Sequence, residues 1–228
     1  NHPELRYEGS VHNQIQPAIA RFVKRTRQRM LRVPAKIVHL GYALPQDARN
    51  KKYETRLHLL KREIEEAADA EIRAYYQYQL GNAYSIMARY QEAAAVLNEI
   101  AYDALIPDNA YYTHLMAAYA NWRTGQPELA MVHADGLFAI DRREPVGYYV
   151  PGLILLALGH PGDALHMLIG AYEANEAHEG AMRFPLHEAQ LYRLIGAICA
   201  QKGIIDRALF FLTLYLEHHP DDSEILNV

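Results

Sequence analysis

The alternation of apolar and polar positions predicts a succession of helices along most of the chain. From residue 46 onward, apolar residues recur at the three- and four-residue spacing of an amphipathic helix. Short stretches that hold Gly or Pro separate these segments, and both residues are typical of helix ends. We expect helices at about 47–67, 70–88, 90–104, 109–124, 127–140, 146–158, 161–176, 186–202 and 205–218.

The first part of the chain follows a different pattern. Residues 14–32 predict a helix with charge on most faces, and residues 35–40, Ala-Lys-Ile-Val-His-Leu, predict a short strand. A single strand finds no partner within a helical array. We therefore expect residues 1–45 to belong to a unit other than the helical region 46–228.

Two segments of the helical region share a pattern of large and small residues. Residues 80–84, Leu-Gly-Asn-Ala-Tyr, are followed by Ala93, and residues 195–199, Ile-Gly-Ala-Ile-Cys, are followed by Ala208. Two antiparallel helices approach closely where Gly or Ala replaces a bulky side chain, so the Gly of each segment is expected to face the Ala of the following helix. This pattern resembles the tetratricopeptide (TPR) repeat.

The small position of the second helix recurs along the chain. Ala93, Ala130, Ala164 and Ala208 follow one another in steps of 37, 34 and 44 residues, and the TPR period is about 34. The long last step places about ten extra residues near 175–185. The expected fold is all-α, a TPR-like right-handed superhelix of antiparallel helix pairs with a short N-terminal helix and strand extension.

Composition narrows the class of protein. Half of the 228 residues are hydrophobic and 22% are charged, as in a globular chain. The net charge of −4 argues against a nucleic-acid binder. The single cysteine, Cys199, excludes an internal disulfide and fits a reducing compartment, so we expect a cytoplasmic protein. The longest apolar run, 153–158, is too short to span a membrane.

Three further blocks lie before the first repeat segment. They are residues 7–13, Tyr-Glu-Gly-Ser-Val-His-Asn, residues 38–42, Val-His-Leu-Gly-Tyr, and residues 49–60, Arg-Asn-Lys-Lys-Tyr-Glu-Thr-Arg-Leu-His-Leu-Leu. In this order, ahead of a TPR segment, they resemble the end of the catalytic GT-A domain in family 2 glycosyltransferases that carry C-terminal TPR repeats. The three blocks lie within residues 7–60, which are about a quarter of the chain.

The resemblance implies a division of the chain and one catalytic residue. Residues 1–45 would be the incomplete tail of the catalytic domain, and His12 would lie near the divalent metal and the donor pyrophosphate. Asn13 departs from the family, which has Glu there. A sugar nucleotide and a divalent metal are implied for the parent family. The chain itself has no Asp-x-Asp and no Gly-rich phosphate loop, so we expect no cofactor and no catalysis from it alone.

The first helix of each TPR lines the concave face of the superhelix. Tyr supplies a large contact area, a low entropy cost and a hydroxyl, which suits a peptide or a sugar. The alternative is that several of these rings only pack between helices. The periodicity places on this face Tyr75, Tyr78, Asn82, Tyr112, Tyr119, Tyr149 and Arg193.

Two other groups of residues bear on binding. Arg21, Lys24, Arg25 and Arg29 form a basic run that could hold a phosphate, an anionic membrane surface or an acidic partner. The alternative is a solvated helix face balanced by the acidic stretch 63–71. None of the twelve His residues has the spacing of a helical zinc site, so no metal site is expected in the chain.

These observations leave three hypotheses for function. The first is a protein-interaction or dimerisation module that forms the C-terminal part of a family 2 glycosyltransferase. The second is a free-standing TPR adaptor or scaffold that binds peptide partners through the Tyr-rich groove. The third is an intact enzyme of unknown type. The expected partner is a protein or peptide, including a second copy of the chain, and no nucleic acid.

Overall fold

The computed structural model describes residue 5 and residues 16–27, 45–177, 186–222 and 225. Within these residues every regular element is a helix. The predicted strand at 35–40 and the predicted site residues His12 and Arg29 lie outside the described residues. None of the described helices is long and apolar enough to cross a bilayer.

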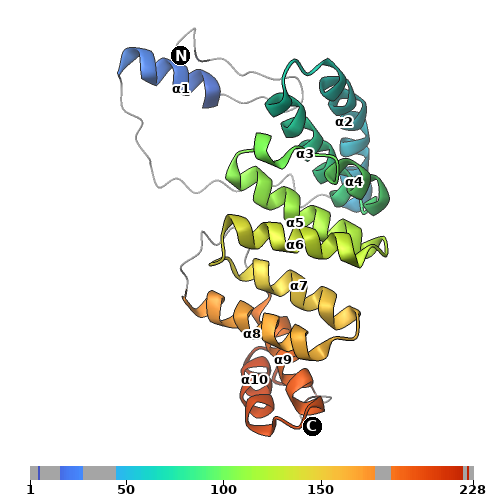
Figure 1. Cartoon of the computed structure of the whole chain (residues 1–228), viewed down its shortest axis with the longest axis vertical. Helices are drawn as coiled ribbons and strands as arrows, with labels where there is room; N and C mark the ends of the chain where they lie inside the picture. The colour runs from blue at the N-terminus through green and yellow to red at the C-terminus, as the bar shows by residue number, and fades with distance from the viewer. Residues whose placement is uncertain (1–4, 6–15, 28–44, 178–185, 223–224, 226–228) are drawn as a thin grey trace.

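Helices α3 to α10 stack as antiparallel pairs along the long axis of the molecule (Figure 1). In each pair a first helix packs against a second helix, and the second helix packs against the first helix of the next pair. The N-terminal α1 spans Gln16–Thr26, and α2, Gln46–Glu66, packs against α3. The first helices are α3 (Ala70–Ile86), α5 (Pro107–Arg123), α7 (Pro145–Ala157) and α9 (Glu188–Gln201), and the second helices are α4 (Tyr90–Leu97), α6 (Pro127–Ile140), α8 (Pro161–Ala177) and α10 (Ile205–His218).

The same turn joins the two helices of all four described pairs. Gly125, Gly159 and Gly203 adopt φ angles of 76°, 79° and 72°, and Ala88 takes their place in the first pair with φ 57°. In each turn the amide of the next residue donates to the carbonyl five positions before it, over 2.8 to 2.9 Å. A left-handed residue that ends a helix in this way is usually Gly. The recurring turn shows that the chain repeats one hairpin.

Gly196 and Gly81 allow the paired helices to approach closely. A Cβ atom on Gly196 would lie 2.6 Å from Cδ2 of Leu212, and one on Gly81 would collide with Cδ2 of Leu97. The nearest neighbour of each glycine is thus a Leu one helical turn beyond the Ala predicted to face it. Those alanines are also buried.

The predicted bounds are correct to within two residues for all helices from α2 to α10 except α4. This helix ends at Leu97, well before residue 104, and a 3₁₀ turn, Tyr102–Ala104, follows. The hydroxyl of Tyr102 donates to the Leu97 carbonyl over 3.1 Å, and the side chain of Asn98 pairs with Asn121 of α5. These tertiary hydrogen bonds replace the helical continuation that the pattern predicted. The helix predicted at 14–32 is described as α1, which ends before Arg27, a residue with φ 56°.

Among the described residues, one cluster of buried side chains lies around α2 to α5 and another around α8 to α10. Cys199 lies in the second cluster, beside Leu168 and Ile195. Burial raises the pKa of its thiol. Because a nucleophilic cysteine needs a lowered pKa, Cys199 is a structural residue of the core.

Candidate functional site

Two of the predicted groove residues, Tyr75 and Tyr78, share a hollow between α3 and the start of α5. Their ring centroids lie 6.3 Å apart. The hollow has a volume of about 420 Å³. Its other lining residues are Glu71, Gln79, Ala104, Leu105, Ile106 and Asn109.

The chemistry of this tyrosine hollow is mixed. Both rings are half-buried, and burial raises the pKa of Tyr75, so its hydroxyl keeps its proton at neutral pH. Gln79 and Asn109 add amide groups that both donate and accept hydrogen bonds. Ile106 is 64% exposed at the edge. The hollow therefore offers aromatic and aliphatic surface next to groups that can pair with a peptide backbone.

Tyr119 lies in a separate aromatic cluster. Its ring packs edge-on against Tyr90 of α4 at 5.4 Å and against Trp122 at 5.7 Å. The guanidinium of Arg123 donates to the Tyr119 hydroxyl over 2.8 Å and lies 4.7 Å from the centroid of the Tyr90 ring. Tyr119 is exposed, but the structure does not bring it into the tyrosine hollow.

The other predicted groove residues are half-buried on their first helices. Tyr149 of α7 packs against the second core cluster, and burial raises the pKa of its hydroxyl. Asn82, Tyr112 and Arg193 lie on α3, α5 and α9, and none of them lines the tyrosine hollow. Tyr149 thus fits the alternative stated above, in which some of these rings only pack between helices.

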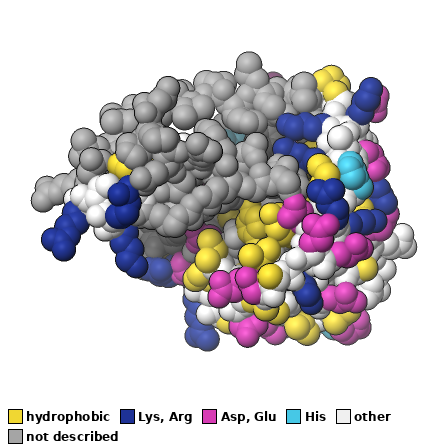
Figure 2. Space-filling view, turned by 90° about the horizontal axis from the view of Figure 1, so that it is seen from above, with side chains coloured by type: hydrophobic (Ala, Val, Ile, Leu, Met, Phe, Trp, Pro, Cys, Tyr) yellow, Lys and Arg dark blue, Asp and Glu magenta, His cyan; other side chains and the backbone are white. Residues whose placement is uncertain are grey.

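The basic run lies partly on α1. Lys24 and Arg25 are exposed, Arg21 belongs to the same helix, and the guanidinium of Arg25 lies 5.7 Å from the centroid of the Phe22 ring. Figure 2 looks onto this end of the molecule: acidic and basic side chains are interspersed on the right, whereas the charged side chains described on the left, where α1 lies, are basic.

The structure assembles a polar cluster that no sequence spacing indicated. Nδ1 of His114 on α5 and Nδ1 of His133 on α6 are 3.2 Å apart, and Nε2 of His133 lies 2.9 Å from Oδ1 of Asn98. The Tyr102 ring stacks on His114 with centroids 4.0 Å apart. Burial and, to a smaller degree, His133 lower the pKa of His114 to about 4, and burial lowers the pKa of His133.

This histidine cluster joins three helices rather than forming a metal site. No group of three His, Cys, Asp or Glu side chains in the described part of the chain has the geometry to hold a metal ion. The two histidines are 19 positions apart in the sequence, so only the packing of α5 on α6 brings them together.

Comparisons with known proteins concern the fold. No protein family profile matches the chain, and no curated protein matches its sequence. Among solved structures, MamA matches at a TM-score of 0.61 and 15% identity, over 78% of this chain and 96% of that chain. BtubC from P. vanneervenii matches at 0.64 and 14%, over 75% of this chain and 76% of that chain.

A third matching structure is described as a TPR protein. YrrB, described as a TPR protein with an unusual peptide-binding site, matches at a TM-score of 0.56 and 18% identity, over 78% of this chain and 83% of that chain. At such identities a likeness speaks to fold and not to function. Together with the recurring hairpin and its glycine turns, these matches show that the chain folds as a TPR-like superhelix of antiparallel helix pairs.

Proposed function

We propose that this protein is an interaction module that binds an extended peptide segment of a partner protein in the tyrosine hollow. The observation that carries the proposal is the meeting of Tyr75 and Tyr78 with the amides of Gln79 and Asn109 around one hollow. Tyr is the residue type that binding surfaces favour as an anchor. The likeness to YrrB, a TPR protein with a peptide-binding site, supports the class of ligand.

The lining indicates which peptides would bind. The two rings offer flat contact area for an apolar side chain, while the amide groups pair with backbone N–H and C=O groups of the peptide. The carboxylate of Glu71 is exposed at the edge of the hollow. Because like charges repel, a neutral or basic segment fits this hollow better than an acidic one.

The test is peptide selection followed by titration. Peptides that bind the purified chain are selected from a random library, and their Kd is measured for wild type, for Tyr78→Ala and for Tyr119→Ala. Loss of an interface anchor costs about 1–2 kcal/mol, so we expect Tyr78→Ala to weaken binding and Tyr119→Ala, outside the hollow, to leave it unchanged. If the selected peptides bind Tyr78→Ala and Tyr119→Ala with the same Kd as the wild type, the proposal is refuted.

A second role, self-association, is favoured by the surface of α10. Ile205, Leu209 and Phe210 are 59%, 61% and 50% exposed. Leu165 of α8 holds the position that corresponds to Leu209, directly after the small Ala, and is 8% exposed because it belongs to the cluster that α8 shares with α9. Leu209 has no such covering helix among the described residues. A second copy of the chain that packs there would bury this apolar strip.

A more specific version of this proposal is that the interaction module forms the C-terminal part of a family 2 glycosyltransferase. This version rests on the sequence resemblance alone. Of the three blocks, only residues 49–60 are described, and they form part of α2. The parent protein would then use a sugar nucleotide and a divalent metal. Its test is the gene: an in-frame upstream region that encodes a GT-A domain with Asp-x-Asp would support the attachment, and a stop codon directly upstream would refute it.

A further inference from the structure

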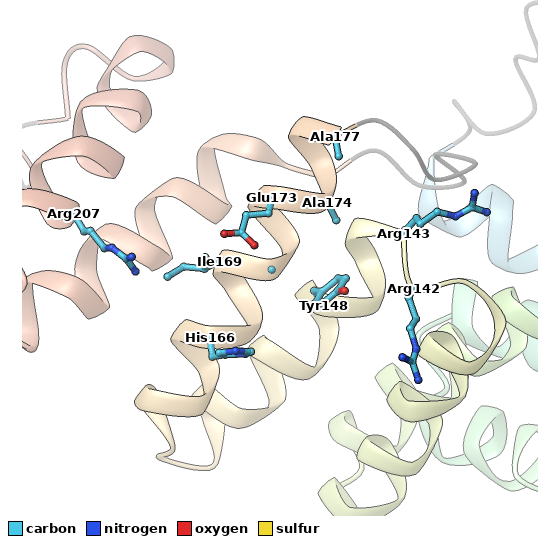
Figure 3. A pocket seen from close by; sticks show the side chains of 10 residues that line it. Arg142, Arg143, Tyr148, His166, Ile169, Glu173, Ala174, Ala177 and Arg207 are labelled. Atoms are coloured by element: carbon cyan, nitrogen blue, oxygen red, sulfur yellow. The ribbon is translucent and has the colours of Figure 1, made fainter.

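A second hollow, of about 560 Å³, lies along α8 and is distinct from the tyrosine hollow (Figure 3). The second helix of the third pair forms its floor, and the turn before α7, α7 itself and α10 form its edges. It therefore draws on the third and fourth helix pairs and on the turn that precedes them. The residues of its lining that matter most are Tyr148, Gly170 and Glu173 at the floor and Arg142 and Arg207 at the edges.

The floor of this hollow is built by close packing. Small residues succeed one another along α8 at Gly170, Ala174 and Ala177. The ring of Tyr148 lies directly against the first of them, since a Cβ atom on Gly170 would be 2.6 Å from Cδ1 of Tyr148. Phe138 of α6 holds the same ring edge-on with centroids 4.6 Å apart. Because packing fixes these groups, the hollow is shaped before any ligand arrives.

Its edges are basic. Arg142 and Arg207 are exposed, and neither forms an ion pair with another side chain in the described part of the chain. Figure 3 shows them on opposite sides of Tyr148, Ile169 and Glu173. The third lining guanidinium, that of Arg143, pairs with Asp141 over 2.9 Å, so Arg142 and Arg207 together outweigh the one carboxylate of the lining, that of Glu173. Guanidinium groups bind carboxylates through strong charge-assisted hydrogen bonds.

We propose that this arginine hollow binds an acidic peptide segment of a partner protein, in the order acid, small apolar residue, acid. The two guanidinium groups stand apart on either side of an apolar floor, so they suit two separate carboxylates with a small side chain between them. A single small anion would leave that floor uncovered. The carboxylate of Glu173 lies between the arginines and repels a negative charge at the central position.

The proposal does not depend on the tyrosine hollow, which lies between α3 and the start of α5 and prefers the opposite charge. A chain that carries both sites would hold a neutral or basic segment between its first and second helix pairs and an acidic segment at its third and fourth pairs. Such a chain would bring two partner segments together.

The experiment uses the full chain and a labelled peptide. A fluorescein-labelled Gly-Glu-Glu-Ala-Val-Glu-Glu-Gly peptide is titrated by fluorescence anisotropy, and the same peptide with Lys in place of Glu serves as the charge control. We expect only the acidic peptide to bind, and Arg142→Gln and Arg207→Gln to raise its Kd by about two- to fivefold each, as is typical of exposed ion pairs. Arg62→Gln removes an exposed guanidinium from α2 and should leave the Kd unchanged.

A second variant tests the floor without changing charge. Ala177 is exposed at the end of α8, so Ala177→Leu fills the hollow while the fold tolerates the larger side chain. It should raise the Kd of the acidic peptide with no loss of helical circular dichroism. Unchanged binding by the Arg142→Gln/Arg207→Gln double variant, equal binding of the Lys peptide, or complete displacement by millimolar inorganic phosphate would each overturn the proposal. Tyr78→Ala should have no effect here, which separates this site from the tyrosine hollow.

Discussion

The Nδ1 atoms of His114 and His133 lie 3.2 Å apart across the contact between α5 and α6. Oδ1 of Asn98 accepts from Nδ2 of Asn121, and it lies 2.9 Å from Nε2 of His133, which therefore carries a hydrogen. Nδ1 of His133 is then the acceptor, and Nδ1 of His114 donates to it. A proton added to Nδ1 of His133 would set two N–H groups against each other, so the cluster holds both rings neutral.

The stability of the protein should therefore fall in mild acid. The pKa of His114 is about 4 in the folded protein, against 6.5 for an ordinary His. The unfolded chain takes up the proton first, so the free energy of unfolding is highest above pH 6.5 and declines as the pH falls toward 4. We expect a loss on the order of 2 kcal/mol from this residue. Urea unfolding at pH 7.5 and pH 4.5 measures it.

Other groups also titrate in this range, so the variant His114→Gln is the necessary comparison. It removes the titrating ring while keeping a polar side chain that can donate to His133. The difference in unfolding free energy between the two pH values should be smaller for the variant than for the wild type. An identical difference in both proteins would show that His114 has no part in the acid sensitivity.

Gly196→Leu should destabilise the last helix pair. A Cβ atom at this position would lie 2.6 Å from Cδ2 of Leu212, so a Leu side chain must push α9 and α10 apart. The expected loss is on the order of 1–3 kcal/mol, as for other overpacked sites. Thermal unfolding measures it, with Gly162→Ala as the control, because a Cβ at Gly162 meets only the end of Lys202 at 3.6 Å. Equal melting temperatures for Gly196→Leu and wild type would contradict the close approach.

Ala88→Gly should stabilise the first helix pair. Ala88 has φ 57°, where the other three turns have Gly. A left-handed backbone costs a non-Gly residue about 1 kcal/mol, so the substitution should add about 0.5–1 kcal/mol to the free energy of unfolding. Gly125→Ala, at the equivalent turn with φ 76°, should change it in the opposite direction. Denaturant titration of both variants decides, and a loss of stability in Ala88→Gly would show that this turn is not strained.

Self-association through α10 should be sensitive to one charge. Leu209 is 61% exposed on this helix, so Leu209→Glu should abolish any dimer formed there without unfolding the protein, since burying an unpaired carboxylate is costly. Sedimentation velocity over a range of concentrations compares it with wild type. Gln201→Glu adds the same charge at an exposed position of α9 and is the matched control. A dimer that persists in Leu209→Glu would place the contact elsewhere.

The sequence alone determined the repeat and most of its helices. Gly at the end of a first helix, Pro at the start of a second helix and a small residue at the crossing are local requirements of a hairpin, so their spacing predicted the elements and their antiparallel pairing. The bounds of α6, 127–140, were predicted to the residue. Cys199 lies in the second core cluster, because its position on the helix period fixes the face that it occupies.

Only the tertiary structure decided which side chains meet. Tyr75 and Tyr78 share a hollow while Tyr119 packs with Tyr90, although one periodicity predicted a single groove for these three tyrosines together with Tyr112 and Tyr149. The early end of α4 gives the reason: it turns the chain so that residues 104–109 close the tyrosine hollow. The helical period determines on which face of its own helix a side chain lies. The angle and offset between successive helix pairs determine which side chains of other helices it contacts. The histidine cluster and the arginine hollow depend on those angles, so the spacing of residues in the sequence does not predict either site.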